Sequence, residues 1–285
     1  MVQLDGSHHP WLEDRGPELV LMTYIDDAKN NTFAYFYDYE GTLPAMDSFK
    51  RYSKKYGLPQ SIYVDKHTTY RSTRKQTQEE ELENKFPLSQ FERALDELGV
   101  NIIHANSPQA KGRVERVLRT FQDRLIKEMR LKGIKTKDEA NKFLEGYLPK
   151  FNQRFSIEPI NPTNLHRPLP KTIDLDKVLS IRTKRALRND FTIRHNKKLY
   201  QILDMPEGIR TKQVIVEERL NGRMYINYNG FTLKYKLIDA KPPKPKEPYK
   251  PRKKYIPPKD HPWRNFRLPT SLDFEEKEEI FAGAL

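Results

Sequence analysis

Between residues 2 and 155, strand-like apolar runs alternate with helix-like apolar stripes, and this order limits the possible folds more than any other feature of the sequence. Residues 18–25 and 32–37 are two apolar runs joined by a short polar turn, which predicts a β-hairpin. In residues 44–56 the apolar side chains recur at helical spacing, so a helix is predicted there. Residues 61–64 then form a short apolar run that predicts a buried strand.

The alternation continues after residues 71–85, which are polar and charged and are expected to be a mobile insert or an irregular, solvent-exposed helix. A helix is predicted at residues 88–98 and a short strand at 100–103. Two further helices are predicted at about 109–131 and at about 137–152. Together with a strand at the N-terminus, this order predicts an α/β fold with a mixed five-stranded sheet and flanking helices.

The pattern changes beyond this first domain. Proline-spaced sequence is followed by a period of two with turn signals such as Asn221-Gly222 and Asn229-Gly230, which is typical of short antiparallel strands. We therefore expect four parts: an α/β domain at 1–155, a linker at 156–185, a small SH3-like β-barrel at 186–240, and a basic proline-rich arm with an acidic C-terminal end at 241–285.

Positive charge is concentrated in two segments. The formal net charge is +13, and residues 111–135 hold nine Lys and Arg against three acids, while residues 241–268 hold ten against two. Cations gathered in this way predict a polyanionic partner such as DNA. The chain has no cysteine, which excludes disulfides and thiolate metal sites, and it has no apolar run long enough to span a membrane.

Three acids stand where an α/β sheet collects functional groups. Asp5 ends the first apolar run, Asp65 follows the strand at 61–64, and Glu115 lies near the start of the long helix. Carboxylates without cysteine or clustered histidine suit Mg²⁺, which prefers oxygen ligands. Two such ions, with Mn²⁺ as an expected substitute, can support an in-line displacement at phosphorus. All three acids are therefore candidate catalytic residues and metal ligands, although a set of three can be chosen from the 39 acids of almost any such chain.

The sequence around these acids adds a family resemblance. Residues 107–116, Ser-Pro-Gln-Ala-Lys-Gly-Arg-Val-Glu-Arg, resemble the SPQ-x-x-G-x-x-E segment of the retroviral-type integrase and transposase superfamily, and match insertion-sequence transposases of the ISNCY type most closely. Residues 3–7 and 63–67 resemble the first and second Asp motifs of that family. The resemblance implies an RNase H-like fold and a DDE triad. The 50 positions from Asp65 to Glu115 exceed the spacing typical of retroviral integrases, and the polar insert absorbs the excess.

The resemblance implies a DNA transposase that cleaves DNA and transfers strands, works as a homo-multimer on DNA, and is cytoplasmic, nucleoid-associated and prokaryotic. Two alternatives are a non-catalytic DNA-binding remnant and an RNase H-like nuclease without transfer activity. Relatives carry an N-terminal helix-turn-helix region that this sequence is expected to lack. The residues expected to contact DNA are Lys111, Arg113, Arg116, Arg119, Asn106, Gln109, Lys253 and Lys254.

Other residues have competing interpretations. Asp26 and Asp27 end the second strand and are rivals of Asp5 for the first metal position, although the order of strands favours Asp5. His67 either faces the metal or makes a local hydrogen bond in a turn, and the second is favoured. Trp11 and Trp263 are expected to pack rather than to stack on bases.

Overall fold

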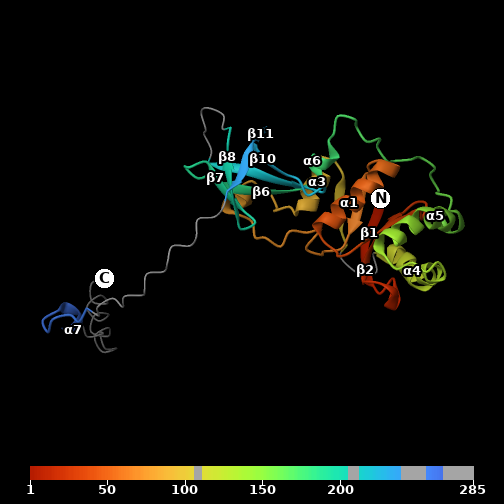
Figure 1. Cartoon of the computed structure of the whole chain (residues 1–285), viewed down its shortest axis with the longest axis horizontal. Coiled ribbons are helices and arrows are strands. Elements are labelled where there is room, and N and C mark those ends of the chain that lie inside the picture. Colours follow the sequence, from red (N-terminus) through yellow and green to blue (C-terminus); the bar gives the residue numbers. More distant parts are fainter. Residues whose placement is uncertain (106–110, 205–211, 239–254, 266–285) are drawn as a thin grey trace, which may run out of the picture. The chain divides into compact units, whose positions relative to one another are not determined.

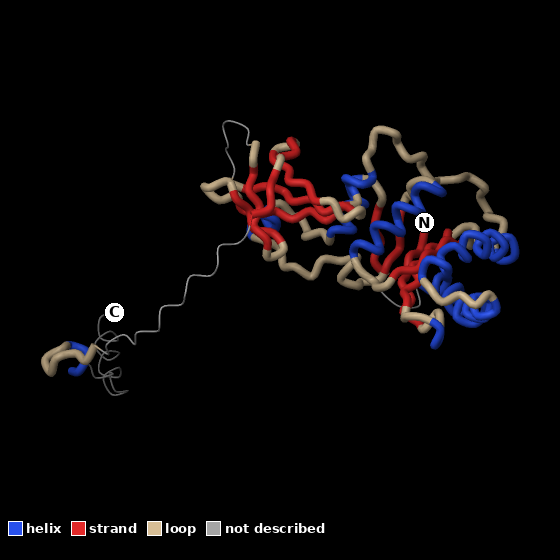
Figure 2. The backbone as a smooth tube through the Cα atoms, viewed as in Figure 1, coloured by secondary structure: helices blue, strands red, loops and turns tan. Residues whose placement is uncertain are grey.

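The computed structural model describes residues 1–105, 111–204, 212–238 and 255–265. Their contacts divide the chain into two units, Met1–Ala240 and Lys241–Leu285, and each is described by itself. Figures 1 and 2 show the sheets and helices of the first unit. Of the predicted arm at 241–285, the structure describes only residues 255–265. They contain a short helix, α7 (Pro262–Asn265).

A mixed five-stranded sheet forms the centre of the first domain. Its strands are β1 (Val2–His9), β2 (Leu19–Asp26), β3 (Thr32–Tyr37), β4 (Ser61–Val64) and β5 (Asn101–His104). They lie in the order β3-β2-β1-β4-β5, with β3, β2 and β1 antiparallel and β1, β4 and β5 parallel. The predicted α/β fold is confirmed, and this order and mixture of directions is that of the expected RNase H-like core.

Helices cover both faces of this sheet. One face packs against α1 (Thr42–Tyr56) and α3 (Gln90–Glu97), and the other against α4 (Gly112–Leu131) and α5 (Lys137–Phe155). The four predicted helices are confirmed, with α4 described from Gly112 onward. The α4–α5 pair packs on the face that buries Trp11, so the packing role expected for this residue is confirmed.

Strand β2 shows why the chain builds two cores. All of its residues except the last are buried, since successive side chains point to opposite faces of the sheet. Val20, Met22 and Tyr24 enter the core beneath α1, while Leu21 and Ile25 enter the core beneath α4 and α5. A strand that is apolar at nearly every position is thus typical of a sheet that is covered on both sides.

The connection between β1 and β2 contacts the far end of α4. It contains a short 3-10 helix, η1 (Glu13–Arg15). The Arg15 guanidinium donates hydrogen bonds to the carbonyl oxygens of Met129 at 3.1 Å and Ile134 at 2.7 Å. Because the last carbonyls of a helix lack partners within it, this arginine satisfies the C-terminal end of α4.

The polar insert contains one short helix, α2 (Gln78–Leu82), with no buried residue. Thr77 accepts a hydrogen bond from the Glu80 backbone N–H, and the Glu80 carboxylate accepts one from the Thr77 backbone N–H. This capping box stabilises the helix without tertiary packing. The solvent-exposed helix was one of the two structures expected for this segment.

In the part of the chain that the structure describes, seven strands follow the first domain. They are β6 (Ser180–Ala186), β7 (Thr192–His195), β8 (Lys198–Ile202), β9 (Gln213–Arg219), β10 (Met224–Tyr228), β11 (Phe231–Leu233) and β12 (Tyr235–Ile238). They form a four-stranded sheet, β11-β10-β9-β6, and a three-stranded sheet, β12-β8-β7. Both contribute to one small core, which includes Ile193, Ile202, Val216 and Ile226.

The segment predicted as a linker, residues 156–185, packs on the first domain. Arg167 pairs with Leu58 through two backbone hydrogen bonds of 2.8 Å, and helix α6 (Leu175–Val178) buries Leu175 in the core beneath α1. Strand β6 already begins at Ser180, before the predicted start of the barrel. Leu169, Ile173 and Leu179 also pack on this core and anchor the second half of the segment, whereas Ile157, Ile160 and Leu165 are exposed.

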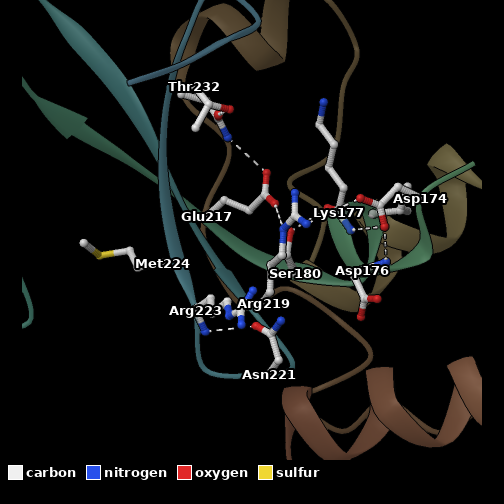
Figure 3. A network of polar contacts seen from close by, with 12 residues as sticks. Asp174, Asp176, Lys177, Ser180, Glu217, Arg219, Asn221, Arg223, Met224 and Thr232 are labelled. Atoms are coloured by element: carbon white, nitrogen blue, oxygen red, sulfur yellow. Dashed lines mark hydrogen bonds and ion pairs between the residues drawn. The ribbon is translucent and has the colours of Figure 1, made fainter. Parts of the chain in front are cut away.

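A buried carboxylate joins α6 to the four-stranded sheet. Glu217 on β9 is 1% exposed and lies 2.7 Å from Arg219, which reaches Asp174 at 3.4 Å (Figure 3). Asn227 donates to the second Glu217 oxygen at 3.1 Å. Buried charges need such partners, so this network fixes the end of α6 against β9.

Candidate active site

Strand register places the first two predicted acids side by side. In the parallel pairing of β1 with β4, Val2 lies opposite Ile62 and Gln3 opposite Tyr63. If the same register is continued beyond these pairs, Asp5 lies opposite Asp65, which follows directly after β4. The pairing of β4 with β5 continues the parallel part of the sheet on the other side. Asp5 and Asp65 therefore lie at the carboxyl-end side of adjacent parallel strands, where such sheets collect functional groups.

A buried lysine lies between these two carboxylates. The Lys111 ammonium is 2.6 Å from Asp5 Oδ1 and 4.0 Å from Asp65 Oδ2, and the lysine side chain is only 7% exposed. Lys111 is the residue before the first turn of α4. The start of α4 is thus fixed to the middle of β1 by a charge-assisted hydrogen bond, which is stronger than a neutral one.

The electrostatic environment of Asp5 is that of a partly desolvated anion. Burial raises the pKa of Asp5, the Lys111 ammonium opposes this, and the carboxylates of Asp65 and Glu40 raise the pKa further. Repulsion among neighbouring carboxylates and loss of water both disfavour the ionised form. A cation at this position offsets both effects, and in this structure the lysine supplies that charge.

Glu40 is a fourth acid at the site that the sequence reasoning missed. Its carboxylate packs over Gly6, where an added Cβ atom would lie 2.8 Å from the Glu40 Cδ. It also lies 3.1 Å from His8 Nε2 and 3.9 Å from His67 Nδ1. The sequence did contain a signal for Glu40, because this acid lies shortly after β3, just as Asp65 lies directly after β4.

Glu115 lies on the first turn of α4, and its side chain is exposed. It is four residues after Lys111, so the two share one side of the helix. Within the described residues, no three His, Asp or Glu side chains lie together closely enough to hold a metal ion. The structure thus brings Asp5 and Asp65 together and leaves Glu115 one turn along the helix that carries Lys111.

The rival acids have structural roles. Asp26 pairs with Val2 across the β1–β2 ladder, three residues or about 10 Å from Asp5 along the strand, and accepts hydrogen bonds from the backbone of its own turn. Asp27 accepts a hydrogen bond from Gln3 at 3.2 Å and pairs with Arg113 at 3.1 Å.

The residues predicted to contact DNA differ in their burial and in their partners. Lys111 is buried against Asp5, and Arg113 donates to the backbone oxygen of Asp27 at 2.6 Å. Lys111 thus differs from the expectation of a surface contact, because its ammonium neutralises a buried acid. Arg116 and Arg119 are exposed on α4. The four other predicted contacts, Asn106, Gln109, Lys253 and Lys254, lie outside the described residues, as does the side chain of Trp263.

His67 makes local contacts, which was the favoured interpretation. Its ring Nδ1 lies 3.2 Å from Thr69 Oγ1, and its backbone N–H donates to Asp65 Oδ1 at 3.0 Å. The second contact orients the Asp65 carboxylate at the end of β4. The loop after β4 therefore helps to fix the position of one predicted ligand.

Comparison with known proteins identifies relatives of one kind. No protein-family model matches the chain. The putative transposase y4bF of Sinorhizobium fredii (strain NBRC 101917 / NGR234) is 36% identical over 243 residues, which are 84% of this chain and 52% of that protein. The transposase for insertion sequence IS1202 of Streptococcus pneumoniae is 30% identical over 307 residues, covering all of this chain and 63% of that protein. The chain thus spans between half and two thirds of the length of these relatives.

Solved structures give weaker likenesses. The catalytic core domain of HTLV-2 integrase in complex with magnesium has a TM-score of 0.41 and 16% identity, covering 58% of this chain and 94% of that chain. A simian T-cell lymphotropic virus intasome in complex with PP2A regulatory subunit B56 gamma has a TM-score of 0.43 and 14% identity, covering 84% and 79%. Likenesses at this level carry no argument about function.

Proposed function

Because this chain is a sequence relative of the transposases of bacterial insertion sequences, we propose that it cleaves DNA strands and transfers them to target DNA with divalent metal ions. The observation that carries the proposal is the position of Asp5 and Asp65 on adjacent strands around one buried cation. Nothing in a purely structural ion pair requires two acids at the carboxyl-end side of parallel strands. A two-metal phosphoryl-transfer site, in contrast, needs carboxylates gathered at one point to hold its ions.

The donor set fits a hard divalent cation. Asp5 and Asp65 offer carboxylate oxygens, and the Lys111 ammonium already occupies the place where positive charge is needed. We propose Asp5, Asp65 and Glu115 as the ligands of two Mg²⁺ ions, with Mn²⁺ as a substitute. Glu115 would join the aspartates from the side of α4 that carries Lys111. In the proposed active form, all three acids of the DDE triad would therefore contact the metal ions.

The proposed reaction has two steps at phosphorus. In the first, a water oxygen attacks the phosphate at the transposon end, the P–O3′ bond breaks, and a 3′-hydroxyl is released. In the second, that hydroxyl attacks a target phosphate and loses its proton to solvent. The target 3′-oxygen leaves and takes up a proton from solvent. Bound divalent ions would stabilise the charge on the phosphate oxygens. Asp5, Asp65 and Glu115 would hold those ions, and no protein nucleophile is required because water and the 3′-hydroxyl are the attacking groups.

The other parts of the chain have proposed roles in DNA binding. We assign Arg116, Arg119 and the arm with Lys253 and Lys254 to the DNA backbone, and the strands from β6 to β12 to an SH3-like barrel that binds DNA. The proposed barrel begins with β6 at Ser180, earlier than the start at residue 186 that the sequence predicted. The chain would act as a homo-multimer on DNA associated with the nucleoid in a prokaryotic cytoplasm. Among the helices in the described residues, none is long and apolar enough to cross a membrane.

One assay separates this function from its alternatives. The protein is incubated with Mg²⁺, plasmid DNA and an end-labelled oligonucleotide that carries a transposon end. Joined products support strand transfer. Nicks without joining indicate a nuclease, and retardation of the DNA without any cut indicates a binding protein. Either of the last two results contradicts the proposed function.

Replacement of Lys111 by methionine is expected to destabilise the metal-free protein and to enlarge its stabilisation by Mg²⁺. Without the ammonium, Asp5 and Asp65 repel each other, and the loss should be about 2 kcal/mol, below the ~3–5 kcal/mol of fully buried pairs because Asp5 is 21% exposed. Added Mg²⁺ replaces the missing charge. The melting temperature with and without Mg²⁺ measures both effects.

The matched control is Lys127→Met, which removes an exposed lysine that is paired with Asp123 along α4. Exposed pairs of this kind contribute little, so this variant should melt and respond to Mg²⁺ like the unaltered protein. Equal Mg²⁺ shifts in the Lys111 and Lys127 variants would show that Lys111 does not stand in the metal position.

A further inference from the structure

A groove between α4 and α5 carries a second concentration of positive charge. Five basic side chains line it, and the acid among its lining residues is Glu128. The basic residues, all exposed, are Arg124, Lys127, Lys132, Lys150 and Arg154. Lys127 has an acidic partner, Asp123, at 2.5 Å. An exposed groove with this excess of cations matches a polyanion.

Aromatic rings form the wall of the groove on α5. Phe143, Tyr147, Phe151 and Phe155 are each one turn apart, and successive ring centroids are separated by 5.5, 6.0 and 4.6 Å. The guanidinium groups of Arg124 and Arg154 lie over the Phe155 ring at 5.6 and 5.5 Å from its centroid. Stacking on a ring orders an arginine while its N–H groups stay free to donate.

The groove continues toward the start of α4. A second hollow shares Phe151 and Phe155 with it and is also lined by Arg113 and Arg116. The two hollows together follow the α4–α5 pair along its length. A continuous basic track suits a long, regularly charged partner better than a small anion.

The groove does not face the proposed active site. Arg124 is nine residues after Glu115, and at 3.6 residues per turn this places them on opposite sides of α4. Glu115 shares its side of the helix with Lys111, which reaches Asp5 and Asp65. DNA held in the groove is therefore not the segment that reacts at the acids of the same subunit.

We propose that the α4–α5 groove binds the phosphate backbone of a second DNA segment, separate from the segment at the acids. The inference rests on the proposed function insofar as DNA is the polyanion. A second copy of the chain fits the groove less well, because a symmetric contact would bring the five cations against five identical ones. The arginines held on Phe155 and the lysines at the rim would contact phosphates.

The test is charge reversal in the whole 285-residue chain. A Lys132→Glu, Lys150→Glu, Arg154→Glu variant is compared with a Lys54→Glu, Lys55→Glu, Lys171→Glu variant, which has the same net charge and altered residues that are exposed elsewhere. Fluorescence anisotropy with a random-sequence DNA duplex is measured over a salt series. Loss of three phosphate contacts should make the slope of log affinity against log salt shallower by about 2–3, and affinity at moderate salt should fall by roughly tenfold or more.

The control variant should show a clearly smaller change. Equal slopes and affinities in the two variants would overturn the proposal. So would a change of oligomeric state, measured by analytical ultracentrifugation, in the groove variant without a change in DNA affinity, since the groove would then be a protein interface. The strand-transfer assay on the unaltered protein separates the two proposals. If the unaltered protein fails to join DNA but the groove effect remains, the proposed function fails and the groove assignment stands.

Discussion

Asp5→Asn, Asp65→Asn and Glu115→Gln are each expected to reduce strand transfer by roughly a thousandfold or more, the scale seen when one member of a cooperating catalytic group is removed. Each change replaces a carboxylate oxygen with a weaker, neutral ligand while the shape of the side chain is kept. DNA affinity should be retained, because a negative charge is removed and no basic residue is altered. Strand transfer and DNA binding are measured on the same preparations.

Asp26→Asn is the control for this series. Asp26 was the rival for the first metal position, and its carboxylate accepts hydrogen bonds from the turn after β2. This variant should keep nearly normal strand transfer. Near-normal joining by any of the three variants would remove that acid from the site, and this matters most for Glu115, whose carboxylate is exposed in the structure.

Trp11→Ala is expected to lower the free energy of unfolding by about 3–5 kcal/mol, the usual loss when a large aromatic side chain is removed from a core. The indole is fully buried, donates a hydrogen bond to the Ser7 carbonyl oxygen at 3.0 Å, and meets Phe36 edge to face at 5.7 Å. Denaturant unfolding followed by circular dichroism measures the change.

Trp11→Phe serves as the comparison, since it keeps an aromatic ring in the core and loses the hydrogen bond to Ser7. It should cost clearly less than the alanine variant. A loss below 1 kcal/mol for Trp11→Ala would mean that the core beneath α4 and α5 closes over the missing ring.

The strands and helices of the first domain were predictable because their apolar periods are clear. Residues 32–37 and 61–64 were predicted with the limits that β3 and β4 have in the structure. The packed segment at 156–185 was not predictable, since prolines dominate its local pattern. Its attachment depends on the pairing of Arg167 with Leu58, a contact between residues far apart in the sequence.

The site was predictable only in part. Asp5 and Asp65 could be found because each follows a short apolar run in the sequence, although β1 continues beyond Asp5 to His9. Lys111 looked like one more cation of a basic helix, and only the packing of α4 against β1 turns it inward. Glu40 was overlooked because it follows an antiparallel strand, yet the sheet brings it over Gly6. Local sequence thus identified the acids, whereas tertiary structure decides which charges surround them.

Both ends of helix α4 are attached by hydrogen bonds to the segment that contains β1 and η1. Lys111 ties its beginning to Asp5, and Arg15 ties its end through the carbonyls of Met129 and Ile134. Because both ends are attached, α4 cannot easily rotate as a rigid body about either of them. The backbone at Glu115 is thereby held in place relative to β1, so that movement of this residue is limited to its own side chain.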